Sequence, residues 1–324
     1  MRILYAASPA IAVPVLESLV REPEGFWELA GLLTNPDASR GRRGGPVPSE
    51  AAAAAAGFLT QDLILKPEKL DAAAREAVMS LRPDLLVSFA YGRIFGPKFL
   101  ALFPLGGINI HPSLLPKYRG PTPIPAAILG RDRETGITIQ RLAAAMDAGD
   151  ILLQERFPLS GRETTEDLSE TAARRAPVLL RQVLAGLVRG DIQGRPQDNQ
   201  EASYCSLISK EDGRIDWNRS AADIDAQIRA YTPWPLSWTT QGDRLLTILE
   251  AQPCEKTGLP APVPPVSIPV LPGSVLGVDK NRGILVQTGE GVLGITRLQY
   301  RTKKALQWQV FLNGAKDFTG SRLL

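Results

Sequence analysis

Short apolar runs alternate with helical patterns through the first half of the chain, and this alternation constrains the fold more than any other feature. Four runs have the continuous apolar character of strands buried on both faces: Arg2–Ala7, Glu28–Thr34, Asp84–Ala90 and Gly107–Ile110. Three segments between them have helical spacing: Pro9–Arg21, Ser49–Gly57 and Pro67–Leu81. Strands that alternate with helices form parallel sheets with crossover connections. We therefore predict an α/β fold with a Rossmann-like, mostly parallel sheet.

The remainder of this half extends the same pattern. Gly136–Leu142 and Asp150–Phe157 are two further candidate strands, and Thr165–Arg189 has the spacing of an amphipathic helix capped by Thr164 or Thr165. The chain then becomes polar around Gly190–Ser203, which is typical of a linker. A length of 324 residues fits two domains. We place the first domain at 1–190, the linker at 191–204 and the second domain at 205–324.

The second half has a different rhythm. After a helix over Ala221–Ala230, short runs punctuated by glycine predict a small antiparallel β-barrel: Leu245–Glu250, Gly273–Val278, Gly283–Thr288 and Gly294–Leu298. Pro260–Pro272 is rich in proline and is expected to be an exposed, stiff loop. Gly289–Gly294 fits the dinucleotide pattern GxGxxG, but strand-like runs lie on both sides and no helix follows. We interpret it as a hairpin turn.

Composition narrows the classes of protein and site. The chain has one histidine, His111, and two widely separated cysteines, Cys205 and Cys254, so neither a metal site nor a disulfide framework is expected. No run approaches the roughly 20 apolar residues of a membrane span, and the N-terminus lacks the pattern of a cleavable signal. We expect a cytoplasmic protein with no membrane partner. The net charge of +3 decides nothing about nucleic acid, which must be argued from local basic patches.

The segment around the single histidine carries the clearest chemistry. Alternate side chains of a strand share a face, so Asn109 and His111 point the same way, and Pro112 then ends the strand. An amide and an imidazole are thereby placed at the carboxyl end of a parallel strand, where clefts of open α/β sheets form. Asp147 lies in an acidic, turn-like segment that could reach the same cleft. The alternative is a purely structural Asn–His pair, and spacing does not separate the two.

Two segments together resemble the 10-formyltetrahydrofolate-dependent formyltransferases: Asn109-Ile110-His111-Pro112-Ser113-Leu114-Leu115-Pro116 and Asp147-Ala148-Gly149-Asp150. The resemblance implies Asn109, His111 and Asp147 as catalytic residues and 10-formyltetrahydrofolate as co-substrate, with no metal. It also implies a folate pocket formed by Phe89, Tyr91, Gly92, Ser113, Leu114, Leu115 and Pro116. Ordinary core packing is the alternative for the aromatic and leucine side chains. Ala6-Ala7-Ser8-Pro9 departs from the family, which usually has glycine and threonine before this proline.

Other segments resemble the branch of this family that acts on charged initiator methionyl-tRNA, and that resemblance covers nearly the whole chain. Thr34–Asp37 and Arg40–Arg43 resemble its basic loop, whereas Arg214–Trp217 and Pro233–Pro235 resemble its OB-like C-terminal domain. The resemblance implies tRNA contacts by Arg40, Arg42 and Arg43, since arginine forks match phosphate oxygens. A possible basic path continues through Lys117, Arg119, Arg301, Lys303 and Lys304. We expect a monomer, because one tRNA could span both domains.

Two other functions stay open on the sequence. A formyltransferase acting on a small amine, such as an amino sugar or a nucleotide, would share every catalytic residue. A non-catalytic RNA-binding protein could use the OB-like domain, since OB folds bind nucleic acid. That second alternative leaves the shared face of Asn109 and His111 unexplained.

Formyl transfer to an amine needs a donor for the oxyanion and an acceptor for the amine proton. The amide NH₂ of Asn109 is a neutral donor. His111 donates a hydrogen bond if it is protonated and accepts a proton if it is neutral, and the sequence leaves both states open. Asp147 is expected to orient the imidazole and to favour its cation.

Overall fold

The computed structural model describes residues 1–21, 25–39, 45–254 and 270–324, and the chain divides into two compact units. The first unit comprises 1–123, 134–158 and 168–206, and the second comprises 124–133, 159–167 and 207–324. Residues 191–204, which the sequence suggests as a linker, therefore lie within the first unit.

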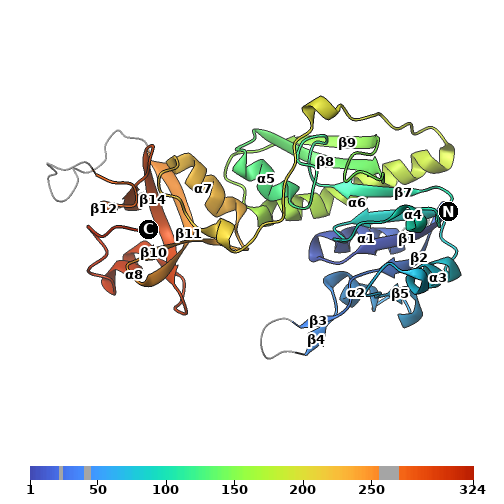
Figure 1. Ribbon diagram of the computed structural model, residues 1–324, viewed down its shortest axis with the longest axis horizontal. Coiled ribbons are helices and arrows are strands. Elements are labelled where there is room, and N and C mark those ends of the chain that lie inside the picture. The colour runs from blue at the N-terminus through green and yellow to red at the C-terminus, as the bar shows by residue number, and fades with distance from the viewer. Residues whose placement is uncertain (22–24, 40–44, 255–269) are drawn as a thin grey trace. The chain divides into compact units, whose positions relative to one another are not determined.

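A seven-stranded sheet forms the centre of the first unit, in the order β5-β2-β1-β6-β7-β8-β9 (Figure 1). The strands are β1 Arg2–Ala7, β2 Glu28–Leu33, β5 Ile64–Leu65, β6 Leu85–Phe89, β7 Gly107–His111, β8 Glu134–Arg141 and β9 Ile151–Pro158. The strands from β5 to β7 pair in parallel, whereas β8 and β9 are antiparallel to their neighbours. The predicted mostly parallel sheet is confirmed. A short hairpin, β3 Ala38–Ser39 with β4 Pro46–Val47, follows β2.

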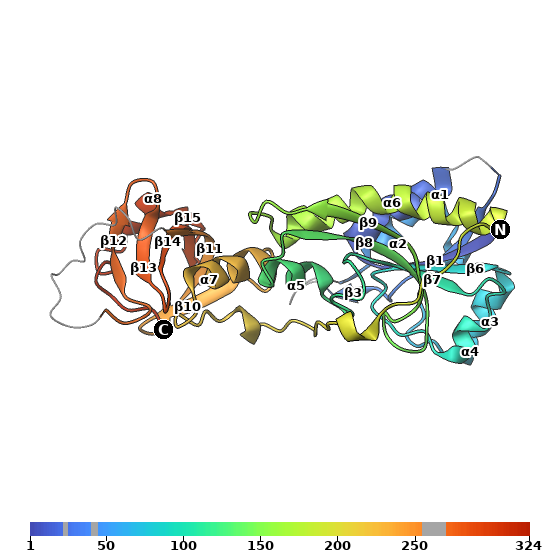
Figure 2. The same ribbon diagram turned by 90° about the horizontal axis from the view of Figure 1, so that it is seen from above.

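Helices cover both faces of this sheet. They are α1 Val13–Arg21, α2 Glu50–Ala55, α3 Ala72–Ser80, α4 Pro97–Leu100 and α6 Thr165–Arg189, whereas α5 Pro123–Leu129 lies almost entirely within the second unit. Figure 2 shows α1 and α6 on one face and α3 and α4 on the other. Val78 of α3 and Phe99 of α4 pack with Leu4, Ala6 and Leu86 of the strands in one buried cluster. Within the described residues, no helix has the length and apolar character needed to cross a bilayer.

Capping residues explain where two of these helices begin. α3 starts five residues later than the predicted Pro67, because the Asp71 side chain caps it by accepting from the N–H of Ala74. α6 has the predicted bounds, and Thr164 rather than Thr165 is its cap. The Thr164 hydroxyl accepts from the N–H of Asp167, whose carboxylate accepts from the N–H of Thr164 at 2.8 Å. This reciprocal pair is a capping box.

The second unit is built on a six-stranded antiparallel sheet with α7 Ala221–Ala230 packed against it. Its strands are β10 Ser237–Gln241, β11 Arg244–Cys254, β12 Val275–Asp279, β13 Gly283–Gln287, β14 Val292–Tyr300 and β15 Leu306–Gln307, followed by α8 Trp308–Asn313. The predicted strand segments fall on β11 to β14. The segment with the GxGxxG pattern spans the turn between β13 and β14, two antiparallel strands, so the hairpin interpretation is confirmed. Of Pro260–Pro272, residues 260–269 lie outside the described residues.

The last residues of the chain join the two edges of this sheet. Leu324 exchanges backbone hydrogen bonds with Thr240 of β10, while Leu323 donates to the carbonyl of Gly273 beside β12. The N–H of Val275 in β12 donates to Ser321. Sheet edges with unpaired backbone groups favour association with other chains, and closure removes them. The C-terminal residues therefore close the sheet in the manner of a small barrel, as predicted.

We expect Leu323→Ala to destabilise the second unit by about 2–5 kcal/mol, because the Leu323 side chain is 1% exposed in the core and its loss leaves a cavity. Urea unfolding followed by tryptophan fluorescence measures this, since Trp217, Trp234, Trp238 and Trp308 all lie in this unit. The matched control is Leu324→Ala, whose side chain is 53% exposed. Equal effects of the two substitutions would contradict the closing role of Leu323.

Candidate active site

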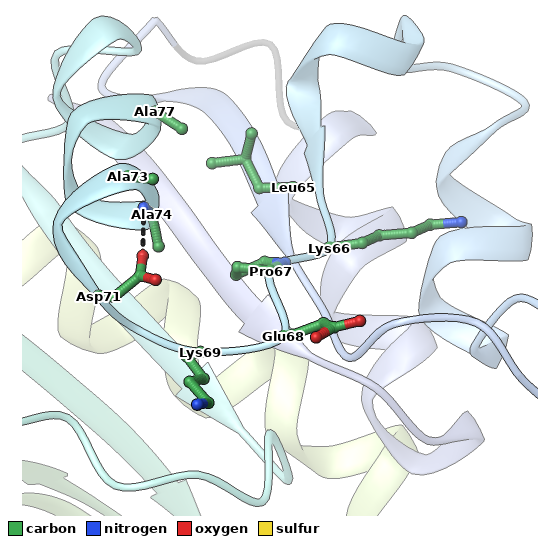
Figure 3. A pocket seen from close by; sticks show the side chains of 9 residues that line it. All are labelled: Leu65, Lys66, Pro67, Glu68, Lys69, Asp71, Ala73, Ala74 and Ala77. Atoms are coloured by element: carbon green, nitrogen blue, oxygen red, sulfur yellow. Dashed lines mark hydrogen bonds between the residues drawn. The ribbon is translucent and has the colours of Figure 1, made fainter.

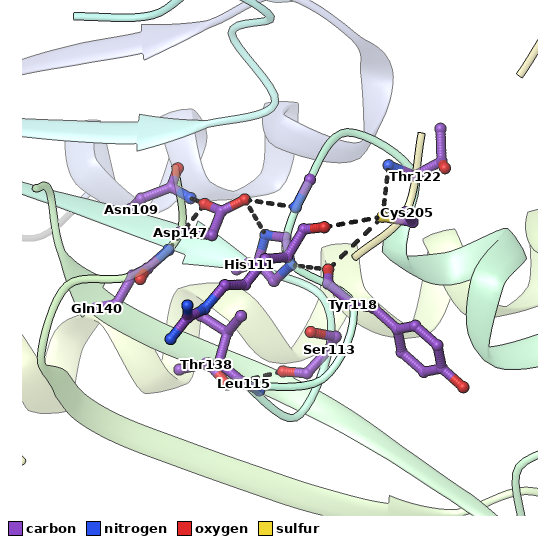
Figure 4. A network of polar contacts seen from close by, with 12 residues as sticks. Asn109, His111, Ser113, Leu115, Tyr118, Thr122, Thr138, Gln140, Asp147 and Cys205 are labelled. Carbon is purple, nitrogen blue, oxygen red and sulfur yellow. Dashed lines mark hydrogen bonds and ion pairs between the residues drawn. The ribbon is translucent and has the colours of Figure 1, made fainter. Parts of the chain in front are cut away.

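Strand β7 delivers Asn109 and His111 to one face at its carboxyl end. The strand ends at His111, directly before Pro112, as the sequence predicts. On the neighbouring antiparallel strand β8, Gln140 pairs with Asn109 and Thr138 pairs with His111. Residues that pair across strands point to the same face. Two strands therefore bring four polar side chains together (Figure 4).

Asp147 lies in the loop between β8 and β9 and turns its carboxylate toward this group (Figure 4). Its Oδ1 accepts from Gln140 Nε2 at 2.8 Å and from Asn109 Nδ2 at 3.4 Å, and its Oδ2 accepts from the Gly120 N–H at 2.9 Å. The backbone of Asp147 has φ +51°, a left-handed conformation that is costly for a residue with a side chain. Such a conformation persists only where the surroundings hold it.

The imidazole of His111 is fixed mainly by a backbone carbonyl. Its Nε2 lies 2.9 Å from the oxygen of Tyr118, whereas its Nδ1 lies 3.7 Å from Oδ2 of Asp147. A carbonyl oxygen can only accept, so Nε2 carries a proton. In the neutral ring, Nδ1 is then the nitrogen with the free lone pair. Asp147 was expected to orient the ring, but 3.7 Å is too long for a hydrogen bond and its influence is electrostatic.

Burial decides the protonation state of His111. Its side chain is 5% exposed, and burial lowers the pKa of the imidazole below the ordinary histidine value. The negative charge of Asp147 and the hydrogen bond to Tyr118 oppose this shift without overcoming it. The site therefore holds a neutral imidazole near pH 7, which favours the proton-accepting role over the cationic one.

The loop after β7 is anchored on β8 and β9. Thr138 donates from Oγ1 to the carbonyl of Ser113 at 2.7 Å and accepts from the N–H of Leu115 at 3.2 Å. Gln154 donates to the carbonyl of Leu115 at 3.0 Å. Ser113 and Leu115 are buried, while Leu114 and Pro116 are half-buried. These four residues are thus rigidly placed beside His111, and their contact with folate stays a prediction.

The segment after β6 presents more backbone than side chain. Phe89 and Tyr91 are buried, and the Tyr91 ring stacks on Phe95 at 5.3 Å between centroids. The Tyr91 hydroxyl has no hydrogen-bond partner among the described residues. Gly92 is exposed, with φ +81°. The two aromatic rings are therefore buried, which is the alternative that the sequence left open for them, whereas Ile94 in the same loop is 74% exposed.

The predicted tRNA-binding residues are differently placed. Lys117 is exposed in the first unit, and Arg301, Lys303 and Lys304 are exposed at the end of β14 in the second. Arg119 is 2% exposed, with its guanidinium bonded to Gln197, Asn199 and Tyr204. We therefore do not retain Arg119 as a phosphate contact. Arg40, Arg42 and Arg43 lie outside the described residues.

Three functional partners escaped the sequence analysis: Tyr118, Gly120 and Gln140. Gln140 had a signal, because Thr138 and Gln140 are polar positions alternating with Ile137 and Ile139 in a buried strand. Tyr118 and Gly120 act through backbone groups, which no side-chain pattern reveals. Gly120 has φ +119°, and a Cβ there would meet the Cys205 carbonyl oxygen at 2.2 Å.

A separate pocket of about 480 Å³ lies beside α3 (Figure 3). It is lined by Leu65, Lys66, Pro67, Glu68, Lys69, Asp71, Ala73, Ala74 and Ala77. Arg93, on the loop after β6, donates to the carbonyls of Pro67 and Glu68 at 3.0 and 2.6 Å, so the pocket adjoins that loop. None of the three predicted catalytic side chains lines it. The predicted catalytic side chains belong to the polar network around Asp147.

Comparison with known proteins agrees with this geometry. Residues 2–184 match the family described as formyl transferase, and residues 207–316 match the formyl transferase C-terminal domain. A methionyl-tRNA formyltransferase of Treponema denticola is 46% identical over 98% of both chains. Another from Chloroflexus aggregans is 38% identical over 97% of both.

Solved structures share the fold at lower identity. A methionyl-tRNA formyltransferase from Clostridium thermocellum superposes with a TM-score of 0.55 at 17% identity, covering 80% of this chain and 95% of its own. An N-formyltransferase from Helicobacter canadensis, solved with folinic acid and dTDP-3-aminofucose, gives 0.64 at 18%, covering 90% and 98%. The identity over the whole length, in both units, places the chain in the methionyl-tRNA formyltransferase family.

Proposed function

We propose that this chain transfers the formyl group of 10-formyltetrahydrofolate to the α-amino group of charged initiator methionyl-tRNA. The observation that carries the proposal is the grouping of Asn109, His111 and Asp147 at the carboxyl end of β7, in a chain that matches relatives of this activity from end to end. When bound, the folate supplies the formyl carbon and the nitrogen that leaves.

The donor set fits this chemistry. Among the described residues, the Asn109 amide nitrogen donates one hydrogen bond, the 3.4 Å bond to Asp147. An amide nitrogen carries two hydrogens. The second N–H is available for the formyl oxygen, on which negative charge develops as the amine attacks. A preorganised neutral donor at that position is the usual device for stabilising such an oxyanion. We assign Asn109 this role.

His111 moves the proton. The amine loses one hydrogen when its nitrogen bonds to the formyl carbon, and the lone pair on Nδ1 of the neutral imidazole accepts it. The resulting imidazolium lies against the carboxylate of Asp147, which stabilises the new charge. Nδ1 then returns the proton to the folate nitrogen as the old carbon–nitrogen bond breaks. The proton lost by the amine is the one gained by the folate nitrogen, and the products are a formylated amine and tetrahydrofolate.

The proposed formyl acceptor rests on the match over the whole chain, because the catalytic groups would serve any primary amine. Amino-sugar formyltransferases share the fold, but at about 18% identity this similarity does not identify a substrate for this chain. The relatives that act on methionyl-tRNA match both units, and the second unit exposes Arg301, Lys303 and Lys304 on one turn. Arg40, Arg42, Arg43 and Lys117 are further proposed contacts. We propose a monomer that acts in the cytoplasm.

We expect Asn109→Ala to slow formyl transfer by about 10²- to 10³-fold, the usual cost of losing one oxyanion donor. Radiolabelled 10-formyltetrahydrofolate and charged initiator methionyl-tRNA report the rate, with uncharged tRNA as the control. Near-normal turnover in this variant would remove Asn109 from the mechanism. Absence of labelling in the unchanged chain, with an amino sugar labelled instead, would overturn the proposed acceptor.

The pH dependence tests the neutral imidazole. Because burial lowers the pKa of His111, the acid limb of kcat/KM should lie below about 6.5. Asp147→Asn removes the charge that raises this pKa, so the limb should move to still lower pH while turnover falls. Asn109→Ala is the matched control, since it should reduce the rate and leave the limb in place. A limb that Asp147→Asn does not move would exclude His111 as its origin.

The basic turn of the second unit is tested by salt. Side chains that neutralise phosphates release counterions from the nucleic acid. The logarithm of the binding constant therefore falls linearly with the logarithm of the salt concentration, with a slope set by the number of phosphate contacts. We expect the combined variant R301Q/K303Q/K304Q to weaken tRNA binding and to reduce the slope by about 1 for each lost contact. Lys280→Gln, an exposed lysine in the same unit, is the control. An unchanged slope would show that this turn does not touch tRNA.

A further inference from the structure

Asp147 needs support beyond the groups that bind its carboxylate. Its backbone is left-handed, and Gly149 after it approaches the Arg141 carbonyl so closely that a Cβ would lie 1.9 Å from that oxygen. The hydrogen bonds to Oδ1 and Oδ2 fix the side chain but do not fix this backbone. The residue that does so lies 50 positions away, in the segment 191–204.

That residue is Gln197. Its Nε2 donates to the backbone carbonyls of Asp147 and Gly149, at 2.9 and 2.7 Å, and lies 3.2 Å from Oε1 of Gln140. Gln140 in turn donates to Asp147 Oδ1. Gln197 therefore contacts the main chain of Asp147 directly and its side chain through one intermediate.

The orientation of the Gln197 amide is determined from both ends. Its Oε1 accepts from Nε and Nη2 of Arg119 at 3.0 and 2.8 Å, and a guanidinium has no acceptor. Its Nε2 faces carbonyl oxygens, which have no donor. A flipped amide would place its NH₂ against the donors of Arg119 and its oxygen against the carbonyl oxygens of Asp147 and Gly149.

Arg119 is held on the same segment. Nη2 donates to Asn199 Oδ1 at 2.9 Å, and Nη1 donates to the Tyr204 hydroxyl at 3.2 Å. Together with the two bonds to Gln197, the guanidinium makes four hydrogen bonds among the described residues, all to neutral oxygens of residues 197–204. Arg119 also stands between Tyr118, whose carbonyl fixes His111, and Gly120, whose N–H binds Asp147. The Arg119–Gln197 contact thereby joins the loop that positions the imidazole to the loop that positions the carboxylate.

We infer that Gln197 is a positioning residue of the formyl-transfer site, which sets the distance between Asp147 and His111 by joining their two loops through Arg119. The inference rests on the proposed function for its catalytic consequence, but the placement of Asp147 is measurable without substrate. Gln197 touches neither reacting group and acts through Asp147.

The test is the titration of the imidazole. His111 is the single histidine, so a chain prepared without a histidine tag gives one ring to follow by NMR as pH changes. Among the described residues, the charge that acts on the ring is that of Asp147, while Cys205 donates to the same Tyr118 carbonyl and the Arg119 guanidinium bonds to residues 197–204. If Gln197→Leu lets the Asp147 loop shift, the carboxylate moves away and the pKa of His111 falls toward its value in Asp147→Asn.

We expect Gln197→Leu to lower the pKa of His111, to reduce kcat by up to about 10²-fold as a misplaced group does, and to leave KM for folate little changed. In Asp147→Asn, adding Gln197→Leu should produce no further fall in that pKa, since the two substitutions act through one contact. Gln197→Met, closer in shape, repeats the measurement if the leucine variant does not fold. Asn199→Ala is the matched control, because it removes another acceptor of Arg119 without touching the Asp147 loop.

An unchanged titration in Gln197→Leu and Gln197→Met would overturn the inference, whatever amine the chain formylates. An equal shift in Asn199→Ala would also overturn it, because general docking of the segment would then be the cause. A chain that formylates no amine would remove the proposed function, while the titration would still decide the position of Asp147.

Discussion

The structure of the site depends on the hydrogen bonds that Asp147 accepts. A partly buried carboxylate is costly unless donors surround it, and here the donors come from three separate segments. Asn109 is on β7, Gly120 on the loop that follows, and Gln140 on β8. Each of these bonds to one carboxylate, so satisfying that charge also fixes the relative positions of the strand end, the loop and the neighbouring strand.

Segment 191–204, the predicted linker, clusters with the first unit. Its glutamine, asparagine and serine residues bond to the loop beyond β7: Ser203 binds the N–H groups of Tyr118 and Arg119, and Cys205 follows with a bond to the Arg119 carbonyl. Within the described part of the chain, the acceptors around the buried Arg119 guanidinium are neutral oxygens, and Gln197, Asn199 and Tyr204 supply them. Most residues of the segment are exposed, and inward hydrogen bonds are made by a few of them, among them Gln197, Asn199 and Ser203.

The sequence predicted the elements correctly where apolar residues recur with a regular period. Strand β7, helix α6 and the two-unit plan were predictable because burial imposes their pattern, and Asn109, His111 and Asp147 were found by alternation and resemblance. Strand β10 was missed because its buried residues are polar. Ser237, Thr239 and Gln241 point inward, Thr239 is bonded to Trp217 and Leu324, and Gln241 is bonded to Tyr300. The sequence did not indicate the pairing of Arg119 with Gln197, because hydrogen-bonded polar side chains leave no periodic signal.

The distance between Nδ1 of His111 and Asp147 bears on catalysis as well as on structure. At 3.7 Å, with a neutral ring, the two groups gain little from each other before reaction. In the proposed mechanism Nδ1 accepts the amine proton, and the same separation then joins an imidazolium to a carboxylate in a buried site, where attraction is far stronger than in water. An interaction that is weak in the resting enzyme and strong as charge develops lowers the barrier, whereas one present throughout would not. In the proposed mechanism, burial keeps the imidazole neutral at rest, and the ion pair with Asp147 forms only as the transition state is reached.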